Sequence, residues 1–230
     1  MQVLIGVGIL LTSYVIGSVP FGQIVVKLLT GKDLRTIASG RTGGTNAMRA
    51  AGPWAGVLTA ILDIFKAAAT VWLAKWLTPN VWIHTLAPIA AVIGHNHSIF
   101  LIERNPDGGL RLRGGAGGAA AGGGAFGLWH PMAFILIPLS FLIWYGTGYA
   151  SVTTLSVGLI TILVFGVRAS LGLGPWAYAF YGLFVELLMI WALRPNLQRL
   201  MDGTERRHGL PVKLQQLKEA RRSKSGGKQS

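Results

Sequence analysis

The chain has 230 residues, of which 51% are hydrophobic and only 13% charged, and its mean hydropathy is positive. Its apolar residues form blocks of about membrane-spanning length without the polar face that a helix of a soluble domain requires, so the composition indicates an integral membrane protein. The absence of cysteine excludes disulfide bonds and thiolate metal sites. The net charge of +13 is not arranged as a basic stripe with interleaved aromatic residues, so no nucleic-acid partner is expected.

Seven apolar segments predict an all-α membrane protein, a bundle of seven transmembrane helices. In chain order they are residues 2–18, 53–77, 81–102, 115–129, 131–145, 151–167 and 175–193. The first segment lacks a basic n-region, so we interpret it as a span rather than a signal peptide. Residues 1–200 are therefore expected to form one transmembrane domain, and residues 201–230 a basic tail with a disordered end.

The basic residues predict the orientation. If the segments alternate across the bilayer, all Lys and Arg residues except Lys66, Lys75 and Arg168 lie on the side of the tail. Lys and Arg accumulate on the cytoplasmic side, so we expect the N-terminus outside and the C-terminus in the cytoplasm of a multi-pass cell-membrane protein. The basic tail is expected to attract anionic membrane lipid.

The first cytoplasmic loop, DLRTIASGRTGGTNAMRAAG at 33–52, combines glycines with many hydrogen-bond donors. Glycine lets backbone amides turn toward an anion, and Ser39, Arg41, Thr45, Asn46 and Arg49 can donate to its oxygens. The alternative is a positively charged loop that only sets the topology.

Two further places carry ionisable residues. Asp63 and Lys66 lie three apart in the second segment, where they form either a structural pair or part of a site. His95 opens HNH at the cytoplasmic end of the third segment and is a candidate general base or hydrogen-bond donor. A helix would point His95 and His97 apart, and no carboxylate cluster accompanies them, so we expect no metal.

The stretch RLRGGAGGAAAGGG at 111–124 begins the fourth segment. Gly115, Gly117 and Ala120 formally fit a dinucleotide-binding pattern, but no strand precedes them, and no GK[ST] follows to make a P-loop. Arg111 and Arg113 immediately before a helix predict an anion site at its N-terminus. The later glycines and alanines predict close helix packing.

Together these clusters resemble one family, the bacterial acyl-phosphate-dependent glycerol-3-phosphate acyltransferases, which are seven-span inner-membrane enzymes. The resemblance is carried by GSVPFG at 17–22, ASGRTGGTNAMR at 38–49, LDIFKA at 62–67, GHNHSIF at 94–100 and NLQRLMDGTE at 196–205. Ser151, which follows Tyr149 and Ala150, resembles the serine of the family's short YxS motif.

The resemblance implies transfer of a fatty acyl group from acyl phosphate to the sn-1 hydroxyl of glycerol 3-phosphate, without a cofactor, giving lysophosphatidic acid for phospholipid biosynthesis. It implies that Ser39 and Arg49 help to hold substrate phosphate. From the residues and the resemblance together, we expect catalytic roles for Ser39, Arg49, His95 and Asn196, and supporting roles for Asp63, Lys66, Arg199 and Glu205. We expect substrate phosphate to be bound by Gly40, Thr45, Asn46, Arg111, Arg113, Gly114, Gly115, Gly117 and Ser151.

The chain departs from the family pattern at two positions that concern charge. Ala116 stands where the family's FKGGKGVAT has its second lysine, and Arg41 stands in the first signature where the family has asparagine. Arg41, Arg111 and Arg113 are the candidates to fill the space beside Ala116. Two other functions stay open: a diverged, inactive lipid-binding member of the same fold, and a small anion transporter.

Overall fold

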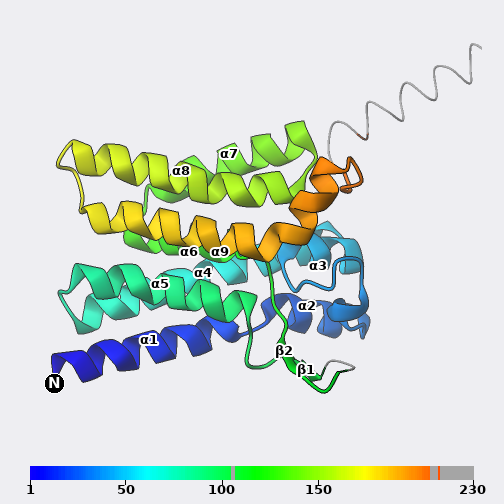
Figure 1. Ribbon diagram of the computed structural model, residues 1–230, viewed down its shortest axis with the longest axis horizontal. Coiled ribbons are helices and arrows are strands. Elements are labelled where there is room, and N and C mark those ends of the chain that lie inside the picture. The colour runs from blue at the N-terminus through cyan, green and yellow to red at the C-terminus, as the bar shows by residue number, and fades with distance from the viewer. Residues whose placement is uncertain (105–106, 208–211, 213–230) are drawn as a thin grey trace, which may run out of the picture.

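A computed structural model describes residues 1–104, 107–207 and 212 as a bundle of helices (Figure 1). Each predicted apolar segment corresponds to one helix of the bundle. These helices are α1 Gln2–Ser18, α4 Pro53–Leu77, α5 Val81–Asn96, α6 Gly118–Leu128, α7 Met132–Thr147, α8 Ala150–Ser170 and α9 Trp176–Met201. Of these, α7, α8 and α9 extend beyond the predicted bounds. The prediction of a disordered tail end falls on residues that lie outside the described part of the chain.

Four stretches of the described chain are long and apolar enough to cross a membrane. They are Gln2–Thr30, Pro53–Leu77, Ala150–Ser170 and Trp176–Met201. Met132–Thr147 is a shorter apolar helix. The helical membrane-protein class is therefore confirmed, whereas the count of seven spans and the orientation stay predictions.

The third predicted segment ends earlier in the structure than in the prediction. The segment 81–102 was expected to be one helix, but α5 ends at Asn96, and residue Ile102 begins a hairpin of β1 Ile102–Arg104 and β2 Leu110–Leu112. The backbone N–H groups of Ser98 and Arg113 donate to the carbonyls of Arg113 and Leu101, both at 3.0 Å, so this part of the chain pairs across the hairpin instead of continuing the helix.

The connection at 19–52 was expected to be a loop and holds three short helices: α2 Phe21–Thr30, the 3₁₀ helix Leu34–Thr36 and α3 Gly44–Ala51. A small core of Val26, Leu34 and Ala47 holds them together. They lie with the hairpin at the end of the bundle opposite the N-terminus (Figure 1).

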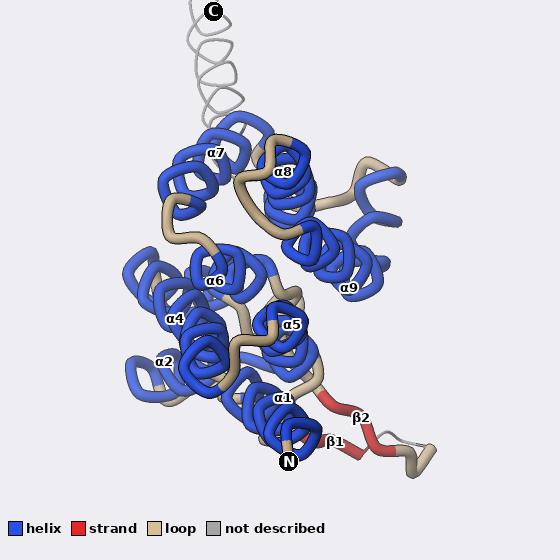
Figure 2. Tube along the Cα trace, turned by 90° about the vertical axis from the view of Figure 1, so that its left-hand side faces the viewer, coloured by secondary structure: helices blue, strands red, loops and turns tan. Residues whose placement is uncertain are grey.

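Helix α6 lies inside the bundle, between α4 and α5 on one side and α7 and α8 on the other (Figure 2). A Cβ atom on Gly123 would overlap the backbone carbonyl of Ile64 on α4. The Tyr181 hydroxyl of α9 occupies the space beside Gly124 and donates to the Ala121 carbonyl at 2.7 Å. The prediction of close helix packing by the later part of the glycine-alanine stretch is confirmed.

This packing predicts opposite effects of alanine at two neighbouring glycines. Gly123→Ala should destabilise the protein by about 1–3 kcal/mol, because the methyl group must push α4 and α6 apart. Gly122 is the matched control: its Cβ would lie 3.8 Å from Leu136 and Val157, so Gly122→Ala should be neutral or stabilise by up to about 1 kcal/mol. Thermal unfolding of the purified variants in detergent measures both, and equal transition temperatures would contradict the packing.

Candidate active site

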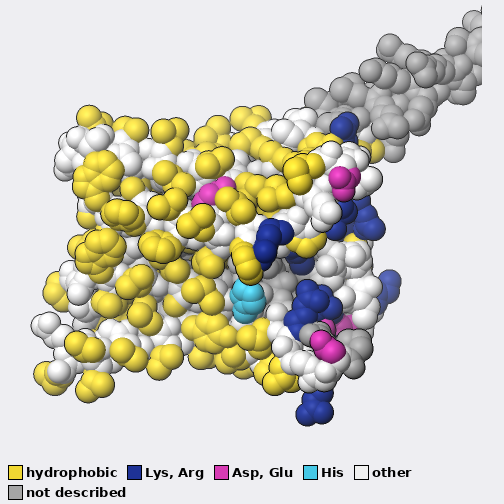
Figure 3. All heavy atoms as spheres, in the orientation of Figure 1, with side chains coloured by type: hydrophobic (Ala, Val, Ile, Leu, Met, Phe, Trp, Pro, Cys, Tyr) yellow, Lys and Arg dark blue, Asp and Glu magenta, His cyan; other side chains and the backbone are white. Residues whose placement is uncertain are grey.

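Charged side chains gather at the end of the bundle that carries α2, α3 and the hairpin, while apolar side chains cover the rest of the face in Figure 3. A cavity of about 1000 Å³ opens at this end, and we call it the polar cavity. Its basic lining residues are Arg41, Arg49, Arg111, Arg113, Arg194, Arg199 and Arg206. Glu205 is the one acidic residue among the described residues that line it. The cavity therefore has the charge that a phosphorylated ligand requires.

A second cavity of about 530 Å³ adjoins the first, and we call it the apolar cavity. Its apolar walls include Val57, Ala60, Phe141, Trp144 and Leu193, from α4, α7 and α9. The two cavities have common lining residues: Ser39, Arg41, Arg49, Asn196 and Glu205. The site can thus hold a molecule, or two molecules side by side, with an anionic part and a hydrocarbon part.

The structure brings nearly all predicted site residues to these cavities. The polar cavity is lined by Ser39, Gly40, Arg49, Arg111, Arg113, Gly114, Gly115, Asn196, Arg199 and Glu205. The apolar cavity is lined by Thr45, Asn46, Asp63, His95, Gly117 and Ser151, besides the common residues. Lys66 lines neither cavity and is buried behind Asp63.

Asp63, Lys66 and His95 form one buried cluster at the base of the apolar cavity. The Lys66 ammonium lies 2.8 Å from the Asp63 carboxylate, 3.0 Å from Nδ1 of His95, and donates to the Val19 carbonyl at 2.7 Å. Nδ1 of His95 also lies 3.5 Å from Asp63. The cluster joins α4 to α5 and to the chain that leaves α1, so it is structural, and two of its members, Asp63 and His95, also line the apolar cavity.

The glycine-rich stretch before α6 packs directly against the end of α5. The N–H of Gly115 donates to the His95 carbonyl at 2.9 Å, and a Cβ atom on Gly115 would overlap the His95 ring. Gly117 has φ of 96°, a left-handed conformation that a larger residue adopts only with strain. The fourth segment was predicted to be helical from Gly115, and these contacts delay the helix to Gly118.

Asn46 fixes the shape of the loop 38–43. Its amide N–H₂ donates to the carbonyls of Leu34, Ile37 and Arg41, at 3.2, 2.9 and 2.8 Å. Ala38 is held at φ of 47°, outside the conformations that alanine prefers. The amide N–H₂ of Asn46 is thus used on the protein itself, whereas Ser39 and Arg41 are presented to both cavities.

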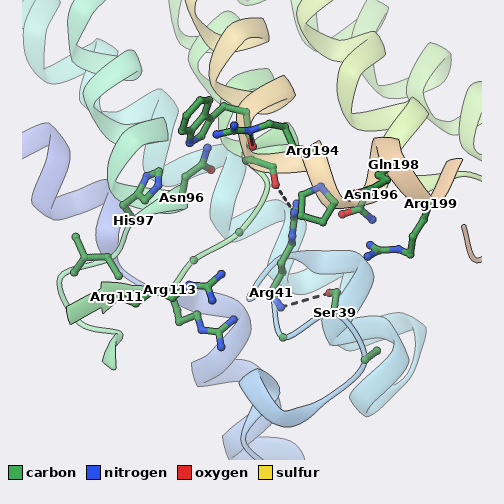
Figure 4. A pocket seen from close by; sticks show the side chains of 18 of the residues that line it. Ser39, Arg41, Asn96, His97, Arg111, Arg113, Arg194, Asn196, Gln198 and Arg199 are labelled. Carbon is green, nitrogen blue, oxygen red and sulfur yellow. Dashed lines mark hydrogen bonds between the residues drawn. The ribbon is translucent and has the colours of Figure 1, made fainter. Parts of the chain in front are cut away.

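The end of α9 and the residues that follow it form another wall of the polar cavity. Glu205, whose side chain is buried, accepts from the Asn196 amide at 2.8 Å and from Nε of Arg199 at 3.1 Å. Arg194 stacks on Trp191 at the rim (Figure 4). Arg194 and Arg206 also line the cavity and were not predicted as site residues, although the position of Arg194 directly after the last apolar segment was a signal.

Glu103 of the hairpin forms ion pairs with two arginines, Arg35 and Arg113. Glu103 on β1 accepts from Nε of Arg113 at 2.7 Å and lies 3.2 Å from Arg35, and its backbone is opposite Arg111 on β2. Arg111 and Arg113 line only the polar cavity, whereas Arg41 lines the same cavity as Ala116. Of the three candidates for the space beside Ala116, only Arg41 reaches the cavity that Ala116 lines.

Comparison with known proteins identifies the same family as the sequence motifs. A family model described as glycerol-3-phosphate acyltransferase matches residues 7–203. A glycerol-3-phosphate acyltransferase of Thermus thermophilus is 35% identical over 200 residues, 87% of this chain and 94% of that protein. One of Rubrobacter xylanophilus is 33% identical over 201 residues, with the same coverage of both chains.

The fold is also similar to a solved structure, the glycerol 3-phosphate form of PlsY (YgiH), an integral membrane glycerol 3-phosphate acyltransferase. The TM-score is 0.73 at 30% identity, over 91% of this chain and 98% of that chain. The resemblance of the sequence motifs is thereby confirmed. The chain belongs to the glycerol-3-phosphate acyltransferase family and is a membrane acyltransferase.

Proposed function

We propose that the protein transfers a fatty acyl group from acyl phosphate to the sn-1 hydroxyl of glycerol 3-phosphate, giving lysophosphatidic acid and inorganic phosphate. The observation that carries this proposal is the pair of adjoining cavities, one rich in arginine and the other walled by Val57, Phe141 and Trp144. One reactant is a small phosphate ester, and the other joins a phosphate to a long hydrocarbon chain. The two cavities match these two shapes.

The reaction needs orientation and charge more than it needs a covalent intermediate. The hydroxyl oxygen of the acceptor attacks the acyl carbonyl, a new ester C–O bond forms, and the bond between the acyl carbon and the phosphate oxygen breaks. The hydroxyl proton leaves with the phosphate, whose oxygens can accept it. Holding both reactants in place contributes most of the rate, together with donors directed at the developing negative charge.

The residues have distinct roles in this proposal. Arg49, Arg111 and Arg113 bind the phosphate of the acceptor, because they line the polar cavity. Ser39 and Asn196 lie where the cavities meet and hydrogen-bond the reacting hydroxyl and carbonyl. The glycine-rich stretch at residues 114–118 lines the same two cavities.

His95 is assigned a positioning role together with Asp63 and Lys66. Its Nδ1 is engaged by Lys66, and the other side of its ring packs against Gly115. It therefore holds the glycine-rich stretch in place. Thr45, Gly117 and Ser151 complete the wall of the apolar cavity.

We further propose seven membrane spans, with the N-terminus outside and the active site facing the cytoplasm. The concentration of Lys and Arg at the cavity end of the bundle supports this orientation (Figure 3). Both substrates of the proposed reaction are charged, and an opening on the cytoplasmic side lets them enter from the compartment that contains phosphorylated metabolites.

The proposed function predicts acyltransferase activity of the purified protein. Purified protein in lipid nanodiscs, given palmitoyl phosphate and glycerol 3-phosphate, should form lysophosphatidic acid and phosphate in equal amounts, measured by mass spectrometry and phosphate release. Bound donor without product would support the inactive lipid-binding alternative. Uptake of glycerol 3-phosphate into proteoliposomes without acylation would support the transporter.

The second prediction concerns the common wall of the cavities. Arg49→Ala and Asn196→Ala should each lower kcat/KM by about 100-fold or more, because the first removes a cation that holds the acceptor phosphate and the second removes a donor directed at the reacting groups. Lys27→Ala is the control: Lys27 lies on α2, lines neither cavity and should retain wild-type kinetics. Wild-type rates in both Arg49→Ala and Asn196→Ala, with folding verified by gel filtration, would refute the site assignment.

The third prediction tests the apolar cavity as the place of the acyl chain. Val57→Phe fills part of this cavity and should shift the preference toward shorter acyl phosphates, with the KM for glycerol 3-phosphate unchanged. Val167→Phe is the matched control, because Val167 is equally exposed, at 49%, and lies outside the cavity. An unaltered chain-length profile in Val57→Phe would place the acyl chain elsewhere.

A further inference from the structure

Arg41 extends from the loop 38–43 across the site to α9. One guanidinium nitrogen, Nη2, donates to the Ala192 carbonyl (Figure 4). The other, Nη1, is buried and has no hydrogen-bond partner within the described part of the chain. Arg41 itself lines both cavities, so its side chain lies where the polar and apolar cavities have lining residues in common.

The surroundings of Arg41 do not neutralise its charge. The nearby charged groups are Arg199 and Glu205, and the Glu205 carboxylate is already occupied by Arg199 and Asn196. Burial lowers the pKa of the Arg41 guanidinium and Arg199 lowers it further, while Glu205 acts in the opposite direction but does not outweigh them. A guanidinium keeps its proton in spite of such shifts, so the site retains a positive charge that an anion from outside can balance.

The glycine-rich stretch on the facing side contributes no cation to the apolar cavity. It presents Ala116, Gly117 and Gly118 there, and Arg41 and Arg49 are the only Lys or Arg side chains among the described residues that line this cavity. Arg111 and Arg113 line the polar cavity only. A negative group next to the hydrocarbon part of a ligand would therefore meet Arg41 or Arg49, and Arg49 is already assigned to the phosphate of the acceptor.

We propose that Arg41 binds the phosphoryl group of the acyl donor at the junction of the two cavities, and that it determines specificity for an acyl phosphate. This inference rests on the proposed function, in which the acyl chain occupies the apolar cavity and its phosphate lies at the open end. As the bond between the acyl carbon and the phosphate oxygen breaks, the departing phosphate gains negative charge. The contact with Arg41 is then stronger in the transition state than in the ground state, so it accelerates the reaction.

The test uses Arg41→Gln, which removes the charge and keeps a polar side chain. Glutamine is shorter and also gives up the contact with the Ala192 carbonyl, so a second substitution is needed to separate the two losses. Arg41→Gln should lower kcat/KM for palmitoyl phosphate by about 10- to 100-fold, as expected for the loss of a charge-assisted hydrogen bond, and should change the KM for glycerol 3-phosphate by less than about twofold. Lys32→Gln is the matched control: it removes one positive charge from the same end of the molecule, outside both cavities. Unchanged donor kinetics in Arg41→Gln would overturn the inference.

A second substitution separates lost charge from altered folding. Ala116→Lys places a cation in the apolar cavity from the facing side, so in the Arg41→Gln background it should restore at least about tenfold of the lost donor kcat/KM. A double variant as slow as Arg41→Gln, with an unchanged unfolding temperature, would mean that charge at this junction is not what the donor requires.

A binding measurement makes the result independent of turnover. Dodecyl phosphate, titrated into the full-length protein, should bind about tenfold more weakly to Arg41→Gln, whereas uncharged dodecanol should bind both forms equally. If the wild-type protein yields no lysophosphatidic acid, the proposed function fails, and this difference alone decides the inference. Equal affinity of both forms for dodecyl phosphate would overturn it.

Discussion

The site depends on the buried ammonium of Lys66. It bonds to Asp63 on its own helix, to His95 on α5 and to the carbonyl of Val19 where the chain leaves α1. A charge at this depth in an apolar bundle is stable only when it is fully paired, and here the pairing also fixes three segments relative to one another. Gly115 donates a hydrogen bond to the His95 carbonyl and packs against the His95 ring, so the position of Gly115 depends on that of His95. The positions of the glycine-rich stretch and of α6 behind it thus follow from one buried cluster.

Next to the cluster of Asp63, Lys66 and His95, the lining of the cavities carries more positive than negative charge. Glu205 is engaged by Asn196 and Arg199, and Glu103 by Arg35 and Arg113. Among the described residues, no ion pair with a carboxylate involves Arg41, Arg111 or Arg194, which also line the polar cavity. Such an arrangement is costly without a ligand and favourable with a phosphorylated one. The apolar cavity beside it can hold a hydrocarbon chain, so a phosphate group bound at the junction could be attached to such a chain.

The sequence predicted the class, and all but one of the site residues that it proposed line the two cavities, because long apolar blocks and clustered polar residues are local signals. It did not predict where helices end at the site. The end of α5 and the start of α6 are set by pairing with the hairpin and by the contact between Gly115 and His95, which join residues distant in the chain. The role of Asn46 was also hidden: a donor in a glycine-rich loop suggested phosphate binding, but its amide N–H₂ is used on three carbonyls of the protein. The position of Arg41 could not be predicted, since its partner Ala192 lies on the last helix.

The account is tested most directly by a structure of the protein with glycerol 3-phosphate and a non-hydrolysable palmitoyl phosphonate. We predict the glycerol phosphate in the polar cavity, the alkyl chain between α4 and α7, and the phosphonate within hydrogen-bonding distance of Arg41, with the sn-1 hydroxyl facing the acyl carbon beside Asn196. An alkyl chain outside the apolar cavity, or a glycerol phosphate whose hydroxyl points away from this junction, would contradict it.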